Sequence, residues 1–204
     1  MKIETLDVAG FAPAFTGMRL PYKSGAKSDS KIDPFSDELM IGQADHDLAL
    51  KLIHAGPEHA KFLRQIVVWA AITAPREWWM QAATYRFGVE VQSESSMHTL
   101  HKRNLTYEDF EDGEANRPEI EQTIHTLNEL RGQYITTKDK AIWRKMVNLL
   151  PQSYLQTRIC TLSYAALANI CRQRKGHKLQ EWATFIDWCR TLPESWLIFG
   201  GDAE

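Results

Sequence analysis

LLPQSYLQTRICTLSYAALANICRQRKGHKLQEW, residues 149 to 182, is the stretch that decides the fold. Residues 154 to 162 are rich in side chains that favour extended backbone, so they predict a strand. Residues 163 to 174 predict a helix with small alanines on one face, which another backbone can approach closely. An amide at Asn169 within this apolar helix has to find hydrogen-bond partners.

The rest of the chain predicts an α+β fold in which helix dominates. Residues 1 to 12 alternate well enough for a first strand, and residues 18 to 43 are rich in Gly, Pro, Ser and Lys. We interpret residues 18 to 43 as a long loop, either solvated surface or facing a ligand, with Arg19 and Ser24 available to an anion. Apolar periodicity predicts helices over the following ranges: 44–55, 57–69, 118–136, 139–149 and 179–189.

A second informative stretch is TAPREWWMQAATYRFGVEVQSESSMHTLHKR, residues 73 to 103. It begins with Pro75, which suits the first turn of a helix, and continues through Trp78 and Trp79 to Tyr85-Arg86. A turn follows in which hydroxyls lie beside a carboxylate and a histidine, a set that suits a phosphate or a sugar. The two tryptophans are best explained as core or subunit contacts.

Composition limits the classes of protein to consider. The chain has 204 residues, 44% of them hydrophobic and 25% charged, which predicts one soluble domain over residues 1–204. The net charge of −2 argues against a binder of duplex nucleic acid. The sequence shows no membrane span and no signal peptide, so we expect a cytoplasmic protein. The three cysteines predict buried reduced thiols, and neither cysteines nor histidines have the spacing of a metal site.

Both stretches resemble the flavin-dependent thymidylate synthases, the ThyX family. Thr84-Tyr85-Arg86 stands where the family has R-H-R, and the segment from Ser93 to His98 stands where it has N-E-x-S-x-R. In the stretch from residue 149 to 182, matching places are occupied by Leu150-Pro151, Thr161, Leu167, Asn169, Arg174 and Gln180. Ser163 and Ala165 occupy places where the family often has Asn and Arg.

The resemblance implies a ThyX-like single domain, helix-rich around a central antiparallel or mixed sheet. It implies FAD as cofactor, methylenetetrahydrofolate and NADPH as co-substrates, and a homotetramer with shared active sites. It assigns no catalytic side chain, because the cofactor carries the chemistry. The implied substrate-binding residues are Arg86, Glu94, Ser96, His98, Arg158 and Arg174. The implied cofactor-binding residues are Arg19, Ser24, Tyr85, Arg86, Asn169 and His177.

Three functions remain open on this basis. The first is a thymidylate synthase-like enzyme that transfers one carbon to C5 of dUMP. The second is a ThyX-fold enzyme that makes another modified pyrimidine nucleotide, for example by hydroxymethylation. The third is a non-catalytic nucleotide-binding or assembly protein, which the replacement of Arg-His by Thr84-Tyr85 favours. Structural roles without ligand contact also remain open, since Arg174 suits a helix C-terminus, where a cation interacts favourably with the helix dipole, and His177 suits an exposed position.

Overall fold

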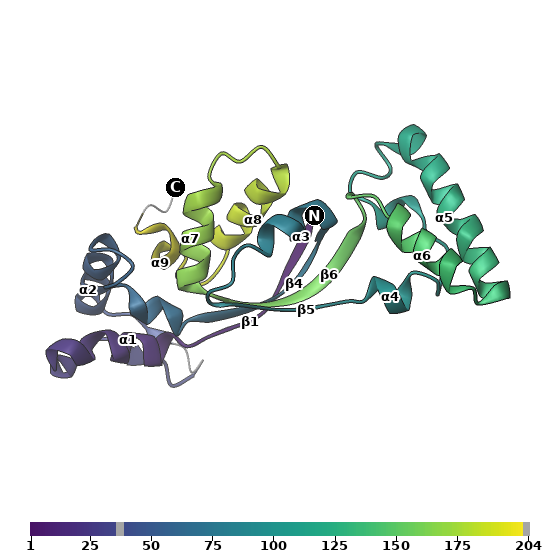
Figure 1. The fold of residues 1–204 in the computed structure, drawn as a ribbon. Helices are drawn as coiled ribbons and strands as arrows, with labels where there is room; N and C mark the ends of the chain where they lie inside the picture. Colours follow the sequence, from purple (N-terminus) through teal and green to yellow (C-terminus); the bar gives the residue numbers. More distant parts are fainter. Residues whose placement is uncertain (36–38, 202–204) are drawn as a thin grey trace. The chain divides into compact units, whose positions relative to one another are not determined.

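The computed structural model describes residues 1–35 and 39–201. Figure 1 shows the order of the elements along the chain. The strands are β1 (Lys2–Ala9), β2 (Lys31–Ile32), β3 (Leu39–Met40), β4 (Val67–Pro75), β5 (Val89–Ser93) and β6 (Leu155–Ser163). The helices are α1 (Phe11–Arg19), α2 (Gln43–His54), α3 (Arg76–Ala82), α4 (Ser96–Thr99), α5 (Arg117–Thr137), α6 (Lys140–Leu149), α7 (Tyr164–Arg174), α8 (Gln180–Arg190) and α9 (Trp196–Phe199). Short 3-10 turns are η1 (Leu20–Tyr22), η2 (Gly25–Lys27), η3 (Lys61–Arg64) and η4 (Tyr107–Asp109).

Four strands form the main sheet in the order β1-β4-β6-β5. The sheet is antiparallel, and the class is the helix-rich α+β fold expected from the sequence. Along β4, buried and half-buried residues alternate, with Val68, Ala70, Ile72 and Ala74 almost fully buried. This alternation is the period of a strand that turns one face to a core.

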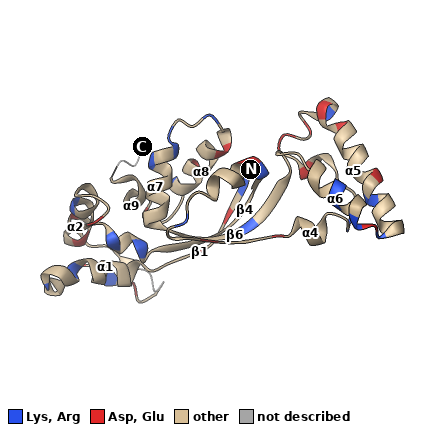
Figure 2. Cartoon of the chain, viewed as in Figure 1, with Lys and Arg blue, Asp and Glu red and all other residues tan. Residues whose placement is uncertain are grey.

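The chain divides into two compact units, and β1, β4, β5 and β6 each contribute residues to both. Unit 1 comprises residues 1–2, 72–84 and 92–159. Within unit 1, α5 and α6 pack side by side (Figure 1). Residues of both helices belong to the hydrophobic core of this unit. Figure 2 shows charges of both signs interspersed over these two helices, as expected of solvated helix faces. The core of unit 1 consists of Leu100, Leu105, Phe110, Ile120, Ile124, Leu127, Met146, Leu150 and Tyr154.

Unit 2 comprises residues 3–71, 85–91 and 160–204. Here α7 contacts α8, α9 and η3, so the helix that follows β6 is the centre of the unit. The helix begins at Tyr164 because the Ser163 hydroxyl accepts a hydrogen bond from the amide of Ala166 at 3.2 Å, which caps the first turn. The buried Trp182, Phe185 and Trp188 of α8 pack in this unit, and the Trp188 indole donates to the Thr5 hydroxyl at 2.9 Å.

Several predicted elements are confirmed within one or two residues. They include the helices at α2, α5, α6, α7 and α8 and the strand at β6. The predicted first strand ends at Ala9, and α1 follows it from Phe11. No finding bears on whether residues 1–204 act as a single domain, which stays a prediction.

Two predicted elements are wrong in part. The helix predicted over 57–69 is only a 3-10 turn at η3, and β4 begins at Val67, because Val67, Val68, Ile72 and Thr73 are β-branched and favour a strand. No strand was predicted between Gly88 and the turn that begins at Ser93, yet β5 lies there, and its Val-Glu-Val start alternates as a strand does.

The predicted loop over 18–43 is only partly irregular. Its first residues, Met18 and Arg19, belong to α1, and η1, η2 and the antiparallel pair of β2 with β3 occupy much of the rest. Residues 36–38 of this segment lie outside the described residues. In the described parts of the chain, no helix has both the length and the apolar character needed to cross a membrane.

Candidate functional site

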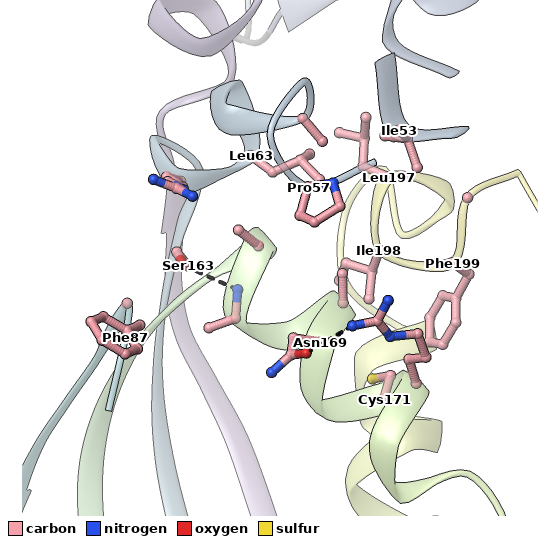
Figure 3. A pocket seen from close by; sticks show the side chains of 18 of the residues that line it. Ile53, Pro57, Leu63, Phe87, Ser163, Asn169, Cys171, Leu197, Ile198 and Phe199 are labelled. Atoms are coloured by element: carbon pink, nitrogen blue, oxygen red, sulfur yellow. Dashed lines mark hydrogen bonds between the residues drawn. The ribbon is translucent and has the colours of Figure 1, made fainter. Parts of the chain in front are cut away.

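A pocket of about 920 Å³ lies in unit 2. Its size is in the range of small-molecule sites, about 300–1,000 Å³. Figure 3 shows it around α7, with Phe87 and Phe199 on opposite sides and Asn169 between them. Apolar residues contributed by α7, α9, η3 and the end of α2 make most of the wall, including Ile53, Leu63, Ala165, Ala166, Ala168, Leu197, Ile198 and Phe199.

The charged residues that line this pocket are all cations. They are Arg64, Arg172, Lys175 and Arg190, and none of the described lining residues is Asp or Glu. The ring of Phe199 holds the Arg190 guanidinium at 4.7 Å from its centroid. An apolar wall with a cationic edge suits a ligand that combines rings with phosphate.

Asn169 is the predicted cofactor residue that lines this pocket. Its Oδ1 accepts from Arg172 Nη2 at 3.1 Å and from Gln173 Nε2 at 3.1 Å. Both contacts use the amide oxygen, so the amide NH₂ group stays available as a donor. Ser163 and Ala165, which stand where the resemblance expects Asn and Arg, line the same pocket.

Gly88 lines the pocket at a position that only glycine can occupy. Its φ is +68°, and a Cβ at this position would lie 2.3 Å from the Ser163 hydroxyl oxygen. The Ser163 amide donates to the Gly88 carbonyl at 2.8 Å, which ties this turn to the start of α7. The turn that carries Phe87 is therefore held against α7 by backbone contacts.

A second cluster in unit 2 joins three of the predicted site residues. Arg174 Nε donates to the Tyr85 hydroxyl at 2.8 Å, and the guanidinium lies 4.5 Å from the Trp182 ring centroid. The His177 ring contacts the edge of Trp182, and His177 Nδ1 accepts from the Leu179 amide at 3.1 Å. Residues 85 and 174 thus meet although 89 positions separate them. Arg86 follows directly and is exposed.

Arg19 has a buried carboxylate partner. Arg19 Nε lies 2.5 Å from Asp45 Oδ1, and the hydroxyls of Ser28 and Ser30 each donate to Asp45 Oδ2 at 2.6 Å. Burial raises the pKa of Asp45, but the hydrogen bonds from Ser28, Ser30 and Arg19 outweigh it, so the pKa is lowered. Ser24 donates to the Arg19 carbonyl at 3.4 Å. The cofactor roles of Arg19 and Ser24 stay predictions.

The remaining predicted substrate residues belong to unit 1. Glu94 directly follows β5, and its Oε1 accepts from the Thr157 amide at 3.1 Å. Ser96 and His98 lie on α4, and His98 is exposed. Arg158 lies over the Trp79 ring at 4.2 Å and donates to Gln156 Oε1 at 3.1 Å. Trp78 and Trp79 are buried, as expected of core residues.

Unit 1 has a smaller pocket of about 260 Å³, and Glu94 lines it. Its polar groups are largely paired among themselves. Arg103 Nη1 donates to Asp109 Oδ2 at 2.8 Å, and this hydrogen bond raises the pKa of Arg103. Burial raises the pKa of the Tyr154 hydroxyl, which also lines this pocket.

The cysteines are free and buried, as expected. Cys171 lines the pocket of unit 2, and burial followed by its hydrogen bond with Cys171 keeps the pKa of Cys189 well above the ordinary value. A thiol with a raised pKa is a poor nucleophile at neutral pH, so Cys189 serves packing.

No family model matches the sequence, and no curated protein matches it either. The fold does have solved counterparts. One is the crystal structure of the flavin-dependent thymidylate synthase ThyX from Helicobacter pylori with FAD and dUMP, at 16% identity and a TM-score of 0.74. The match covers 100% of this chain and 99% of that one. A second structure of Helicobacter pylori ThyX with FAD and dUMP gives 17% identity and a TM-score of 0.73 over the same shares.

This chain has the ThyX fold. The match extends over the full length of both chains, so it includes both units and all four strands of the main sheet. At 16–17% identity the likeness establishes the arrangement of the backbone. The residues that line the pocket have to be judged by their own chemistry.

Sequence reasoning missed five lining residues that matter to the pocket: Phe87, Arg64, Arg172, Lys175 and Arg190. The cations lie in η3, in α7, directly after α7 and in α8, so no motif joins them along the chain. Phe87 could have been found from the sequence, because it directly precedes Gly88 in the informative stretch from residue 73 to 103.

Proposed function

We propose that this chain is a divergent flavin-dependent thymidylate synthase-like protein that binds FAD and a deoxyuridylate-type nucleotide. The observation that carries the proposal is the full-length likeness to ThyX structures that contain FAD and dUMP. The motif resemblance of residues 84–98 and 149–182 supports it independently.

The pocket of unit 2 fits FAD in size and in the chemistry of its donors. Its four cations suit the diphosphate, its apolar wall suits rings, and the Asn169 amide offers a donor. In this proposal the cations of the pocket edge supply the positive charge that Ala165 does not, since an arginine is expected there from the family pattern. When bound, FAD supplies the hydride chemistry of the reaction.

The chain's own residues bind and orient the ligands. Arg174 holds the nucleotide phosphate, because its guanidinium is oriented by Tyr85 and Trp182. Arg86 adds to the nucleotide contacts in the proposal, and Tyr85 and His177 contact the flavin. The substrate-binding roles of Glu94, Ser96, His98 and Arg158 in unit 1 stay predictions. Methylenetetrahydrofolate and NADPH are the proposed co-substrates, and the proposed assembly is a cytoplasmic homotetramer with shared sites.

One experiment tests the reaction itself. Purified protein is incubated with dUMP, methylenetetrahydrofolate, NADPH and FAD, and the nucleotide products are identified by mass spectrometry. The proposal predicts dTMP that forms only when FAD is present. A hydroxymethylated nucleotide would instead assign the second function considered above.

A non-catalytic role is the second candidate, and one contact favours it. Tyr85 stands where the family has a histidine, so this position has a phenol in place of a titratable imidazole. The Tyr85 hydroxyl accepts a hydrogen bond from Arg174. This candidate predicts nucleotide binding without any turnover of dUMP or oxidation of NADPH in the same incubation.

A further inference from the structure

Phe87 is exposed to an unusual degree for a phenylalanine. Its side chain is 95% exposed, yet it lines the pocket of unit 2 (Figure 3). Leaving a benzyl group in water forgoes the stabilisation that burial of the ring provides. A ligand that covers the ring recovers that stabilisation.

The chain on both sides of Phe87 is tied to α7. The Gly88 carbonyl accepts a hydrogen bond from the Ser163 amide at 2.8 Å, and the Tyr85 side-chain hydroxyl accepts one from Arg174 Nε at 2.8 Å. The φ of +68° at Gly88 and its close approach to Ser163 allow no side chain there. Phe87 is therefore presented by a fixed turn, and a ring on a fixed turn loses little entropy when it packs on a ligand.

The surroundings of Phe87 specify the class of ligand. On the wall of α7 stand Ala165, Ala166 and Ala168, whose small side chains leave room for a flat group. The cations of the same pocket suit phosphate, as described above. A planar ring linked to phosphate is the chemistry of a nucleotide.

We infer that Phe87 is a ligand-stacking residue, which packs against a planar ring of the nucleotide cofactor bound in the unit 2 pocket. The inference deepens the proposed function, under which that cofactor is FAD. Stacking on an aromatic side chain contributes to affinity with little dependence on which ring is stacked. Phe87 would then determine how tightly the cofactor is retained.

The test compares two equally exposed phenylalanines. Phe35 is 98% exposed and does not line the pocket, so Phe35→Ala is the matched control for Phe87→Ala. FAD binding is measured by the change in flavin absorbance, and ADP binding is measured by calorimetry. We expect Phe87→Ala to weaken FAD binding about 10-fold or more, and Phe35→Ala to leave it within about twofold.

A second variant reads out stacking itself. Phe87→Trp keeps a ring at the position, so FAD affinity should be retained, and where the stacked ring is the flavin its fluorescence should be quenched more strongly than with Phe87. If Phe87→Ala also weakens ADP binding, the stacked ring is the adenine, and if only FAD binding weakens, it is the flavin.

Other outcomes overturn the inference or separate it from the proposed function. Unchanged FAD and ADP affinities in Phe87→Ala overturn it, and a change of oligomeric state alone would assign Phe87 to a subunit contact. If the wild type binds ADP but not FAD and Phe87→Ala weakens ADP binding, stacking stands while the flavin proposal fails. A wild type that binds neither ligand refutes both.

Discussion

Unit 2 contains two kinds of arginine, and they differ in what neutralises them. Arg19 is 5% exposed, and its partner Asp45 is fully buried and also held by two serine hydroxyls. Arg64 and Arg172 are exposed at a pocket whose described lining residues include no carboxylate. The first arrangement satisfies a charge inside the protein, and the second leaves charge to face a ligand.

The difference separates residues that hold the fold from residues that hold a ligand. Removing one partner of a buried ion pair leaves an uncompensated charge, which destabilises the folded state strongly. Removing an exposed cation changes stability little, because water already screens it. Substitution in the buried ion pair should therefore lower the free energy of unfolding, whereas substitution of an exposed pocket arginine should change ligand affinity.

The largest expected effect is that of Asp45→Ala. This substitution leaves the Arg19 guanidinium buried without its carboxylate partner, so we expect the free energy of unfolding to fall by about 3–5 kcal/mol. Urea denaturation measures this loss. The control Glu114→Ala removes an exposed partner of Arg117 and should leave the free energy of unfolding close to that of the wild type. Equal losses in the two variants would abolish the distinction.

Arg174→Ala should have the next largest effect, on nucleotide affinity. A charge-assisted hydrogen bond to phosphate contributes about 1.5–3 kcal/mol, so dUMP binding should weaken by about 10- to 100-fold. Calorimetric titration with dUMP measures it. Arg117→Ala, at an exposed ion pair of unit 1, serves as the control. Unchanged dUMP affinity in Arg174→Ala would remove Arg174 from the nucleotide site.

Charge reversal at the pocket edge tests whether an exposed arginine there contributes to ligand affinity and not to stability. Arg172→Glu places a carboxylate where the ligand's phosphates are proposed to bind, and we expect FAD affinity to fall about 10-fold at low salt. The loss should shrink as ionic strength rises, while the unfolding midpoint stays close to that of the wild type. An affinity loss that does not depend on salt would point to a packing role for Arg172.

The smallest expected effect concerns pH. The pKa of Asp45 is lowered in the folded state, so its contribution to stability is present above the unfolded-state pKa of about 3.9. That contribution is lost as the pH falls through the lower folded-state pKa. Denaturation of the wild type and Asp45→Asn should show a stability difference that narrows as the solution is acidified. A difference independent of pH would mean that Asp45 does not titrate with a lowered pKa.

The sequence predicted the helical half of the fold better than the sheet. Helices α5, α6 and α7 have clear apolar periodicity or a capping residue such as Asp139 or Ser163, and both caps are seen. The first residues of strand β4 were mistaken for the end of a helix because the apolar run there is continuous, and continuous runs have no period that separates a buried strand from a helix. Its β-branched residues held the missing information.

The candidate site was predictable only where a motif carries it. Asn169, Arg174, His177 and Tyr85 were identified from two stretches, and the structure places Tyr85, Arg174 and His177 around Trp182. The cations of the pocket edge come from separate elements, so only the folded chain reveals that they share a pocket. The buried Arg19–Asp45 pair could not be foreseen from a loop composition that suggested solvent exposure.

The absorption spectrum of the purified protein tests the central claim most directly. It is recorded with and without added FAD and dUMP, before and after gel filtration. A ThyX-like flavoprotein should show the visible bands of oxidised flavin, retained with the protein through the column and perturbed by dUMP. A colourless protein that does not retain added FAD would contradict the flavoprotein assignment and would leave a ThyX fold put to another use.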